Sequence, residues 1–430
     1  MNNLYKNINL LLNKNRNEYK ENFSIKYFKL FENIKCKKIE KKTIEILILN
    51  PPCYGFGDLI FAHKLANYLR KWYDCNVFVA TTLPKKLKML GESEKYLLHL
   101  YSKGRTSCRR FKKLKLLDLE KRTVKKVFDL IVVAPIHYDS TSDYRDVKHL
   151  IPYSNYLNTI FFSEYNDSLQ SFFHFHTGIG KKRYGLLLTD PIISKKKIIN
   201  SKYAMVYIAN AGSVSRPMTC FSNFAIMVCE KHQLESKFEI ICPGWIANNY
   251  VSNKKRVEKY EKYFKKIVIK TGKKMVSYIS DNSNKNNTLI INGSILPVNN
   301  QKMLNLMKYS VRDILVTGDQ SLTDVLSCCG TKNVFYQIAS HKENFARKLA
   351  ELLPNKYLER KKTSCGGLKS LSYDSNYKQF IKDNDARIKL KKPLDNIVCS
   401  VIKSKQDERL KEFVEKLSRR GTIIFENIKV

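Results

Sequence analysis

The sequence contains no long hydrophobic run and no recognisable export signal. Nowhere in its 430 residues is there a stretch close to the roughly 18 consecutive apolar residues of a membrane-spanning helix. The first residues (MNNLYK) lack the charged-then-apolar plan of a secretory signal. These two absences predict a soluble protein of the cytoplasm.

The cysteines lack any metal-binding spacing. The chain has 11 cysteines, but none forms a Cys-x-x-Cys pair, and no Cys/His cluster has the spacing of a zinc finger. Several lie inside apolar runs, where a reduced thiol acts as a small hydrophobic side chain. We therefore expect free thiols in a reducing compartment and no metal site.

Acidic residues are scarce. Asp and Glu number 39 against 78 Lys and Arg, which gives a formal charge of +39. The excess is spread over the whole chain, and codons of an A/T-rich genome would produce it without selection for a ligand. One stretch, residues 105–126, exceeds this background with ten basic residues. It is either a solvated face or a nucleic-acid contact, with these candidate residues: Arg105, Arg109, Arg110, Lys112 and Lys113.

What is present is enough apolar sequence for real cores and an alternating pattern of strands and helices. Hydrophobic residues make up 43%, and 25 Tyr and 22 Phe exclude wholesale disorder. Short apolar runs that predict buried strands occur at 43–50, 76–80, 128–134, 158–162, 203–209, 237–242, 288–292, 313–317 and 333–338. Helical patterns separate many of them, and one charged helix is expected over about 248–264. Such alternation predicts an α/β fold with two Rossmann-like, doubly wound parallel sheets.

The restart of this pattern near residue 203 predicts the domain plan. We expect an N-terminal helical extension, an N-terminal Rossmann-like domain, a linker, a C-terminal Rossmann-like domain, and an extension with an amphipathic helix near 404–420. Their boundaries are 1–43, 44–190, 191–202, 203–354 and 355–430. Ligands of such folds bind at the carboxyl ends of the strands, so the loops there are the candidate sites.

The first such loop is Gly55-Phe-Gly57-Asp58. Its two glycines let a ligand approach the backbone, and the following helix start favours an anionic group. It is not a dinucleotide fingerprint, because Ile60 stands where a third glycine would be. A tight turn with Asp58 as the helix cap is the other interpretation.

Two more loops belong to the second half. Residues 210–217 contain Arg216, whose guanidinium suits a diphosphate unless it is a lone surface arginine. Residues 317–324 (TGDQSLTD) are the richest. Gly318 allows a sharp turn, Ser321 is expected to cap the next helix or bind an anion, and Asp324 completes a capping box or accepts from ribose hydroxyls.

The segment from the strand at 313–317 to His341-Lys-x-x-Phe345 resembles the sugar-nucleotide half of GT-B glycosyltransferases. That resemblance implies two domains facing across a cleft and a nucleotide-sugar donor. Carried over, Gln320 and Ser321 meet the donor's diphosphate and Asp324 its ribose, with Gly318, Asp319, Arg216 and His341 nearby. The chain departs from the superfamily in lacking Gly-x-Pro after the helix and a pair of spaced glutamates. Its Lys- and Asn-rich composition resembles that of proteins of large DNA viruses, which would place it in host cytoplasm or a virion.

The resemblance implies a metal-independent, inverting glycosyl transfer to an unknown glycan or protein acceptor. This reaction needs a base for the acceptor proton, and the candidates are Asp58 and His137 in the first domain. A catalytically inactive, basic nucleic-acid-binding or virion-associated protein on the same fold is the alternative. A nucleotide-dependent epimerase would share the donor half.

Overall fold

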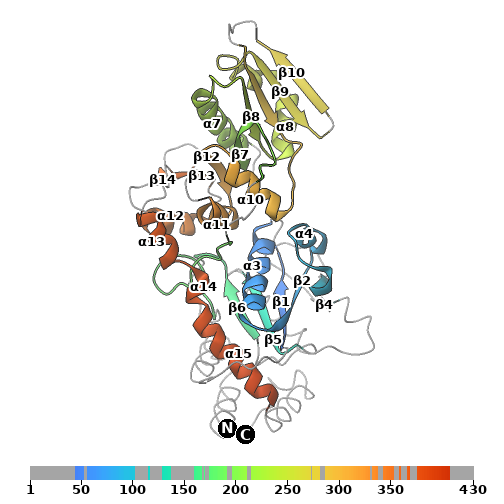
Figure 1. Cartoon of the computed structure of the whole chain (residues 1–430), viewed down its shortest axis with the longest axis vertical. Coiled ribbons are helices and arrows are strands. Elements are labelled where there is room, and N and C mark those ends of the chain that lie inside the picture. The colour runs from blue at the N-terminus through green and yellow to red at the C-terminus, as the bar shows by residue number, and fades with distance from the viewer. Residues whose placement is uncertain are drawn as a thin grey trace. The chain divides into compact units, whose positions relative to one another are not determined.

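The structure, a computed structural model, is shown in Figure 1. It describes the following residues: 44–52, 56–101, 115–116, 128–136, 159–166, 169, 174–190, 196–210, 215–272, 274–280, 286–329, 332–337, 342–352, 358–359, 366–368 and 375–406. Among them, no helix is both long and apolar enough to span a bilayer.

The chain folds into two compact units. Unit 1 contains the described residues up to Leu187 and those from Asn384 onward, and unit 2 is Leu188–Asp383. The chain's C-terminal helices therefore belong with its first half.

Unit 1 is built on a sheet with the strand order β4-β3-β2-β1-β5-β6. All its pairs are parallel except the short β3–β4 pair. Its core strands are runs of Ile, Leu and Val, as expected for strands buried on both faces. The elements are β1 (Ile44–Asn50), α3 (Gly57–Trp72), β2 (Cys75–Thr81), α4 (Pro84–Met89), the 3-10 helix η1 (Glu94–Tyr96), β3 (Leu97–Tyr101), β4 (Lys115–Leu116), β5 (Leu130–Ile136) and β6 (Thr159–Ser163).

Two C-terminal helices, α14 (Ala386–Lys389) and α15 (Lys391–Gln406), complete unit 1. The Tyr73 hydroxyl donates to Asp395 Oδ1 at 2.8 Å, and the Lys391 ammonium lies 4.8 Å from the centre of the Tyr73 ring. Upstream of α14, Leu186 N–H donates to Asn384 O at 2.7 Å. These contacts attach α15 to α3, and Asn384 to the segment at Leu186.

Unit 2 is built on a sheet with the order β10-β9-β11-β8-β7-β12-β13-β15-β14. Its central strands are parallel, and antiparallel pairs occur at both edges. The elements are β7 (Lys202–Tyr207), α7 (Ser215–Lys231), β8 (Lys237–Ile241), α8 (Gly244–Val251), α9 (Lys254–Glu258), β9 (Lys266–Thr271), β10 (Lys274–Ile279), β11 (Thr288–Asn292), α10 (Asn300–Tyr309), β12 (Asp313–Thr317), α11 (Asp319–Cys328), β13 (Asn333–Gln337), α12 (Glu343–Leu352), β14 (Leu358–Glu359), β15 (Gly366–Leu368) and α13 (Ser375–Asp383).

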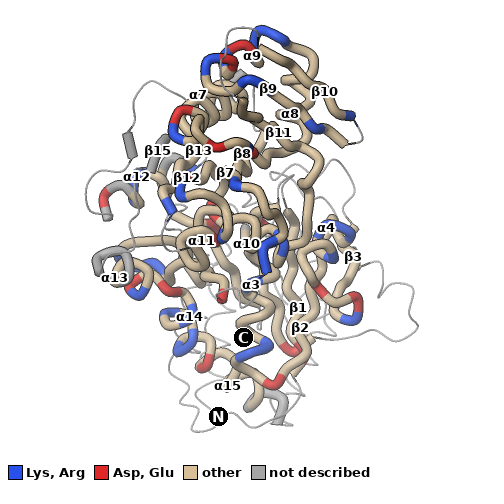
Figure 2. The backbone as a smooth tube through the Cα atoms, turned by 45° about the horizontal axis from the view of Figure 1, so that its top comes forward, with Lys and Arg blue, Asp and Glu red and all other residues tan. Residues whose placement is uncertain are grey.

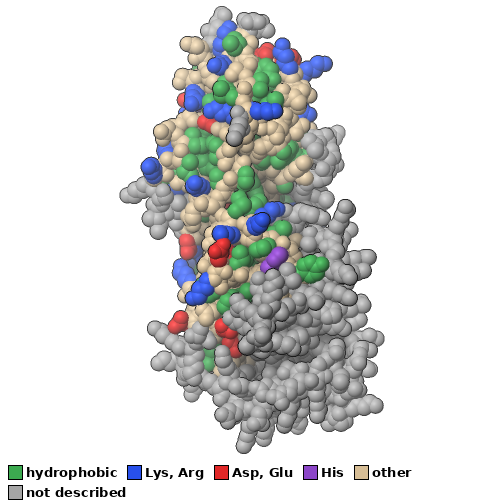
Figure 3. All heavy atoms as spheres, turned by 90° about the vertical axis from the view of Figure 1, so that its right-hand side faces the viewer, with side chains coloured by type: hydrophobic (Ala, Val, Ile, Leu, Met, Phe, Trp, Pro, Cys, Tyr) green, Lys and Arg blue, Asp and Glu red, His purple; other side chains and the backbone are tan. Residues whose placement is uncertain are grey.

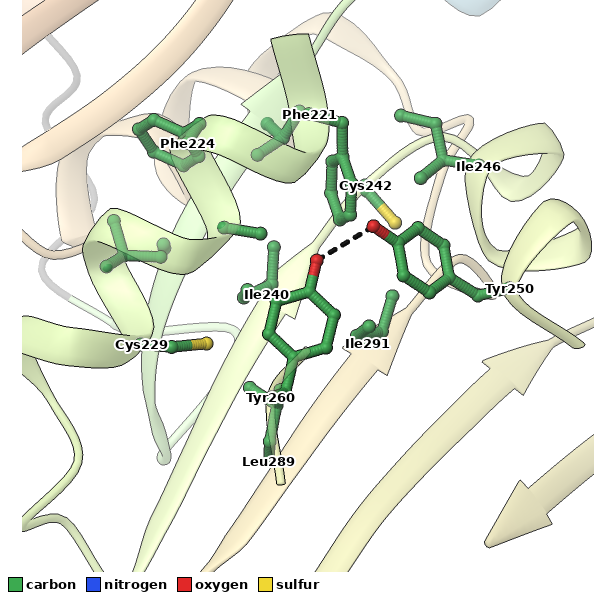
Figure 4. Close-up of a cluster of buried hydrophobic side chains, with 14 of the residues drawn as sticks. Phe221, Phe224, Cys229, Ile240, Cys242, Ile246, Tyr250, Tyr260, Leu289 and Ile291 are labelled. Carbon is green, nitrogen blue, oxygen red and sulfur yellow. Dashed lines mark hydrogen bonds between the residues drawn. The ribbon is translucent and has the colours of Figure 1, made fainter. Parts of the chain in front are cut away.

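The core of unit 2 lies between this sheet and helices α7 and α8 (Figure 4). Phe221 on α7 packs edge-on against Tyr250 on α8, and both side chains are buried. The hydroxyls of Tyr250 and Tyr260 form a buried hydrogen bond of 2.7 Å, so each satisfies the other inside an apolar cluster. Burial raises the pKa of Tyr260 well above its ordinary value. This pair is structural.

The predicted α/β class with two doubly wound sheets is confirmed. Two details of the expectation are wrong. The single helix over 248–264 is two short helices, α8 and α9, because Ser252 ends the first and Asn253 adopts an extended backbone. Cys399 is disulfide-bonded, although free thiols were expected throughout. The helix α15 covers Lys391–Gln406, and the rest of the helix predicted near 404–420 lies outside the described residues.

Candidate functional site

The strand order of unit 2 places a topological switch point between β7 and β12. From β7 the chain first builds the sheet toward β8 and β11, and then returns to add β12 and β13 on the other side. In open α/β sheets, ligands bind beside the carboxyl ends of the strands at such a point. Here that position holds Tyr207, the end of β7, and Thr317, the end of β12.

Gly318 turns the chain from β12 into α11. Its φ of 77° and ψ of 149° lie in a region that side chains with a Cβ rarely adopt. A Cβ built on this residue would meet no heavy atom of the described residues within 4 Å, so among them the space in front of the backbone is open. The turn therefore exposes its main chain to an incoming ligand.

The first turn of α11 supplies backbone donors that have no partner within the helix. Gly318 is the N-cap, and Leu322 N–H makes the first intrahelical bond, to Gly318 O at 3.2 Å. The amides before it, from Asp319 to Ser321, are those that a helix leaves without intrahelical partners. Such amides, together with the helix dipole, favour an anion. Ser321 was expected to cap this helix; instead the helix begins two residues earlier, and no side chain caps it.

The carboxylate of Asp319 at this helix start is neutralised by its neighbours. Lys342 Nζ lies 2.8 Å from Asp319 Oδ2, and the Tyr336 hydroxyl donates to Asp319 Oδ1 at 3.1 Å. The Asp319 side chain is buried, and Lys342 is mostly so. The negative charge is thus compensated within the cluster, which leaves the positive end of the helix available.

Two glutamines carry buried acceptors at the same edge. Gln320 is 4% exposed and Gln337 is 7% exposed, and among the described residues neither side-chain oxygen has a hydrogen-bond partner. Thr317 and Gln337 face each other across β12 and β13, and the Thr317 hydroxyl donates to Gln337 O at 3.1 Å. A buried acceptor without a partner costs about 1–3 kcal/mol, a cost that a ligand hydroxyl or N–H would remove.

Asp324 is also buried, one turn further along α11. Its Oδ1 accepts from the Thr189 hydroxyl at 2.6 Å, and Thr189 N–H donates to Ser327 Oγ at 3.3 Å. Burial, and after it the charge of Asp324, raises the pKa of Tyr207. Asp324 thus holds the segment at Thr189 against α11.

The corresponding edge of unit 1 is closed by one side chain. Asn50 ends β1 with no exposed surface, and its Nδ2 donates to Asp58 O and to Ala134 O, each at 3.0 Å. The Thr81 hydroxyl donates to Asn50 Oδ1 at 3.4 Å. One amide therefore joins the ends of β1, β2 and β5 to the start of α3.

Asp58 was expected to cap α3, but it does not. The N-cap is Phe56, Gly57 is the first helical residue, and Asp58 lies in the first turn with a partly exposed side chain. A Cβ on Gly57 would also meet no atom within 4 Å. Its backbone, unlike that of Gly318, does not require glycine, because no left-handed φ occurs there.

The structure describes the side chains of none of the remaining predicted residues. Arg216 is the second residue of α7, but its side chain is not among those described. Gly55, His137 and His341 lie outside the described residues, as do the basic candidates Arg105, Arg109, Arg110, Lys112 and Lys113.

His174 and His176 show no sign of metal binding in the described structure. His174 Nδ1 accepts from Phe161 N–H at 3.0 Å, and the imidazole stacks on the Phe161 ring. Burial, followed by the neighbouring His176, lowers the pKa of His174 to about 3, so the ring is neutral. The part of the chain that is described contains no group of three or more metal-ligating side chains.

Sequence reasoning missed Asn50, Thr189, Tyr336, Gln337 and Lys342. Asn50 and Gln337 carried a signal, because each is a polar residue that ends an apolar strand at the ligand-binding edge. The others carried none, since their roles depend on which strands and segments become neighbours.

No model of a known protein family matches the chain, and no curated protein matches it. Solved structures that resemble it include UDP-GlcNAc 2-epimerase from Methanocaldococcus jannaschii, 14% identical, with a TM-score of 0.39 over 77% of this chain and 97% of its own. A co-structure of S. aureus MnaA with UDP is 12% identical, with a TM-score of 0.37 over 79% and 94%. E. coli heptosyltransferase WaaC with ADP-2-deoxy-2-fluoro heptose is 8% identical, with a TM-score of 0.30 over 64% and 82%. Likeness at this level assigns no ligand or reaction to the chain.

Proposed function

We propose that the chain binds a nucleotide sugar at the switch point of unit 2 and transfers its sugar to an acceptor in a GT-B type reaction. The observation that carries this proposal is the Gly318 turn. It combines open backbone, three helix amides that have no intrahelical partner, and two buried amide oxygens at one edge of the sheet. A nucleoside diphosphate sugar offers the matching groups, an anionic diphosphate flanked by hydroxyls.

In this proposal the diphosphate lies against the backbone amides of Asp319, Gln320 and Ser321. The contact of Lys342 with Asp319 removes the repulsion that a free carboxylate would exert on an anion. The buried oxygens of Gln320 and Gln337 accept from ribose or sugar hydroxyls. Asp324 is the ribose partner that the resemblance implies, with Thr189 as its present hydrogen-bond partner.

The chemistry is a displacement at the sugar carbon. An acceptor hydroxyl gives its proton to a base, its oxygen bonds to the anomeric carbon, and the bond from that carbon to the diphosphate breaks. The α11 amides stabilise the charge that develops on the leaving diphosphate, without a metal ion. Asp58 and His137 remain the proposed bases.

Titration calorimetry of the full chain with UDP-, GDP-, ADP- and CMP-sugars tests the binding step. At least one donor should bind, and Gln320→Met together with Gln337→Met should weaken it by about tenfold or more. The matched control is Gln379→Met, an exposed glutamine on α13. Silence across the panel from a folded protein, or equal affinity in all variants, contradicts the proposal. Release of the nucleoside diphosphate with acceptor present then separates transfer from an epimerase that keeps the nucleotide attached.

The alternative, a basic nucleic-acid-binding protein on this fold, has its own test. Its affinity for duplex DNA should fall with salt at a slope of about −0.9 per neutralised phosphate. A variant that replaces Arg105, Arg109 and Arg110 by Gln should flatten the slope by about three units. A flat response in the unaltered chain removes this alternative.

A further inference from the structure

The edge of the unit 2 sheet carries exposed aliphatic side chains. Among the described strands, β10 pairs only with β9, in antiparallel register, so its outer edge has no partner strand. Met275 and Ile279 on this strand are 66% and 67% exposed. They lie four residues apart, about 13 Å along the strand and on one face. An edge strand is normally protected from contacts, so two bare aliphatic side chains here need a reason.

Basic side chains share this face. In the β9–β10 register, Met275 lies opposite Lys270 and Ile279 lies opposite Lys266, and opposite residues of an antiparallel pair project to the same side. The other face of β10 behaves differently, because Tyr278 packs against the core of unit 2. The apolar pair and the lysines are therefore a surface feature and not an extension of the core.

The segment that forms β9 and β10 carries charge of one sign. Residues 262–280 contain six lysines and no acidic residue. Figure 2 shows the basic positions along α9, β9 and β10, and Figure 3 shows hydrophobic and basic side chains side by side at this end of unit 2. The partner that complements it is anionic and accepts aliphatic side chains.

We propose that the face of β9 and β10 formed by Lys266, Lys270, Met275 and Ile279 docks on an anionic lipid surface. The aliphatic tips enter the boundary between headgroups and acyl chains, while the lysines remain among the acidic headgroups. A lipid surface fits better than a nucleic acid, because single-strand binders stack bases on aromatic side chains and arginine, and this face presents neither among its described residues. The inference does not depend on the proposed sugar transfer.

Cosedimentation of the full chain with phosphatidylcholine vesicles, with and without phosphatidylserine, tests it. Binding should require phosphatidylserine and weaken with salt. Lys266→Gln with Lys270→Gln should lower the vesicle partition coefficient by about 25-fold, since each lysine near an anionic surface contributes about fivefold. Met275→Ser with Ile279→Ser should lower it by about tenfold or more. All four positions are on the surface, so the thermal melt should not change.

Two control variants distinguish a built surface from general basicity. Lys85→Gln with Lys237→Gln removes the same charge from exposed positions elsewhere, and Leu234→Ser removes an apolar side chain that is 94% exposed on a turn. Both should change partition by about twofold or less. Equal losses from both lysine pairs, or no effect of the Met275 and Ile279 changes, overturn the proposal. The proposal is also overturned if the variants keep vesicle binding but lose binding to duplex DNA. The same holds if they keep vesicle binding but lose concentration-dependent self-association through β10.

Discussion

Units 1 and 2 share a topology but differ at the carboxyl ends of their strands, where the edge is closed in unit 1 and open in unit 2. Each has its first strand in the middle and a switch point beside it. In unit 1 the buried Asn50 side chain donates hydrogen bonds to the carbonyl oxygens of Asp58 and Ala134. In unit 2 the equivalent edge has the open Gly318 turn and two buried oxygens that lack a partner among the described residues. At the switch point of a doubly wound sheet, the position where a ligand can bind can thus be filled by a single side-chain amide.

Both units should lose stability as the pH falls, each in its own pH window, and the acid window of unit 1 gives the largest effect. His174 in unit 1 has a pKa of about 3 against an ordinary 6.5. The unfolded chain takes up a proton below pH 6.5, while the folded one does so only near 3. Unit 1 should therefore lose stability as the pH falls through this window, by an amount of the order of 4 kcal/mol.

Each unit contains one tryptophan, so urea unfolding can be followed unit by unit. Trp72 reports on unit 1 and Trp245 on unit 2, with the other replaced by Phe. His174→Asn keeps an acceptor for Phe161 N–H and should remove the acid dependence. His99→Asn, an exposed control on β3, should leave it unchanged. An unaltered pH slope in His174→Asn would show that other groups cause it.

Unit 2 should show the same direction of change in an alkaline window. Burial, only partly offset by Cys329, lowers the pKa of Lys332 to about 8, and its ammonium donates to Val311 O at 3.2 Å. The folded unit loses this proton near pH 8, whereas the unfolded chain holds it to about 10.5. Stability of unit 2 should therefore rise across that window by roughly 3 kcal/mol. Lys332→Met should flatten the rise in the Trp245 signal, and an identical slope in both proteins would refute the assignment.

Opening the closed edge of unit 1 should cost a similar amount. Asn50→Ala leaves two buried carbonyls without their donor and should lower the free energy of unfolding of unit 1 by about 3 kcal/mol. Asn67→Ala, an exposed position on α3, should cost about 0.5 kcal/mol or less. Urea titration of the Trp72 signal measures both, and similar costs would mean that Asn50 does not hold the edge together.

Substitutions of Gly318 and Gly57 should have the smallest effect on stability, and comparing them should give the clearest effect on binding. Gly318→Ala forces a side chain into a left-handed backbone and should cost about 1–2 kcal/mol, while its Cβ projects into the open space where a diphosphate would lie. Gly57→Ala has equal space and no such strain, and should be neutral or slightly stabilising. Only Gly318→Ala should weaken donor binding in calorimetry; equal effects of both would place the ligand elsewhere.

Sequence reasoning succeeded where a local pattern decides the structure. The buried strands β1, β5, β7 and β12 were predicted because both faces are apolar, and the Gly318 turn because glycine before a helical pattern marks one. The strands β3, β4 and β10 were missed because they are short or lie exposed at an edge, with no continuous apolar run. The start of α11 was misplaced because a backbone φ, and not a capping side chain, sets it. The contact of Lys342 with Asp319 could not be foreseen, since it follows from the pairing of β12 with β13.

Hydrogen exchange of the full chain, with and without UDP, GDP and ADP, tests the central claim most directly. Peptides covering Gly318 to Val325 should become protected when a nucleotide binds, because the unpaired amides of α11 then acquire an acceptor. Peptides covering the start of α3 act as the internal reference and should change little. Protection at α3 with none at α11, or no change in either with binding shown independently, would contradict the account.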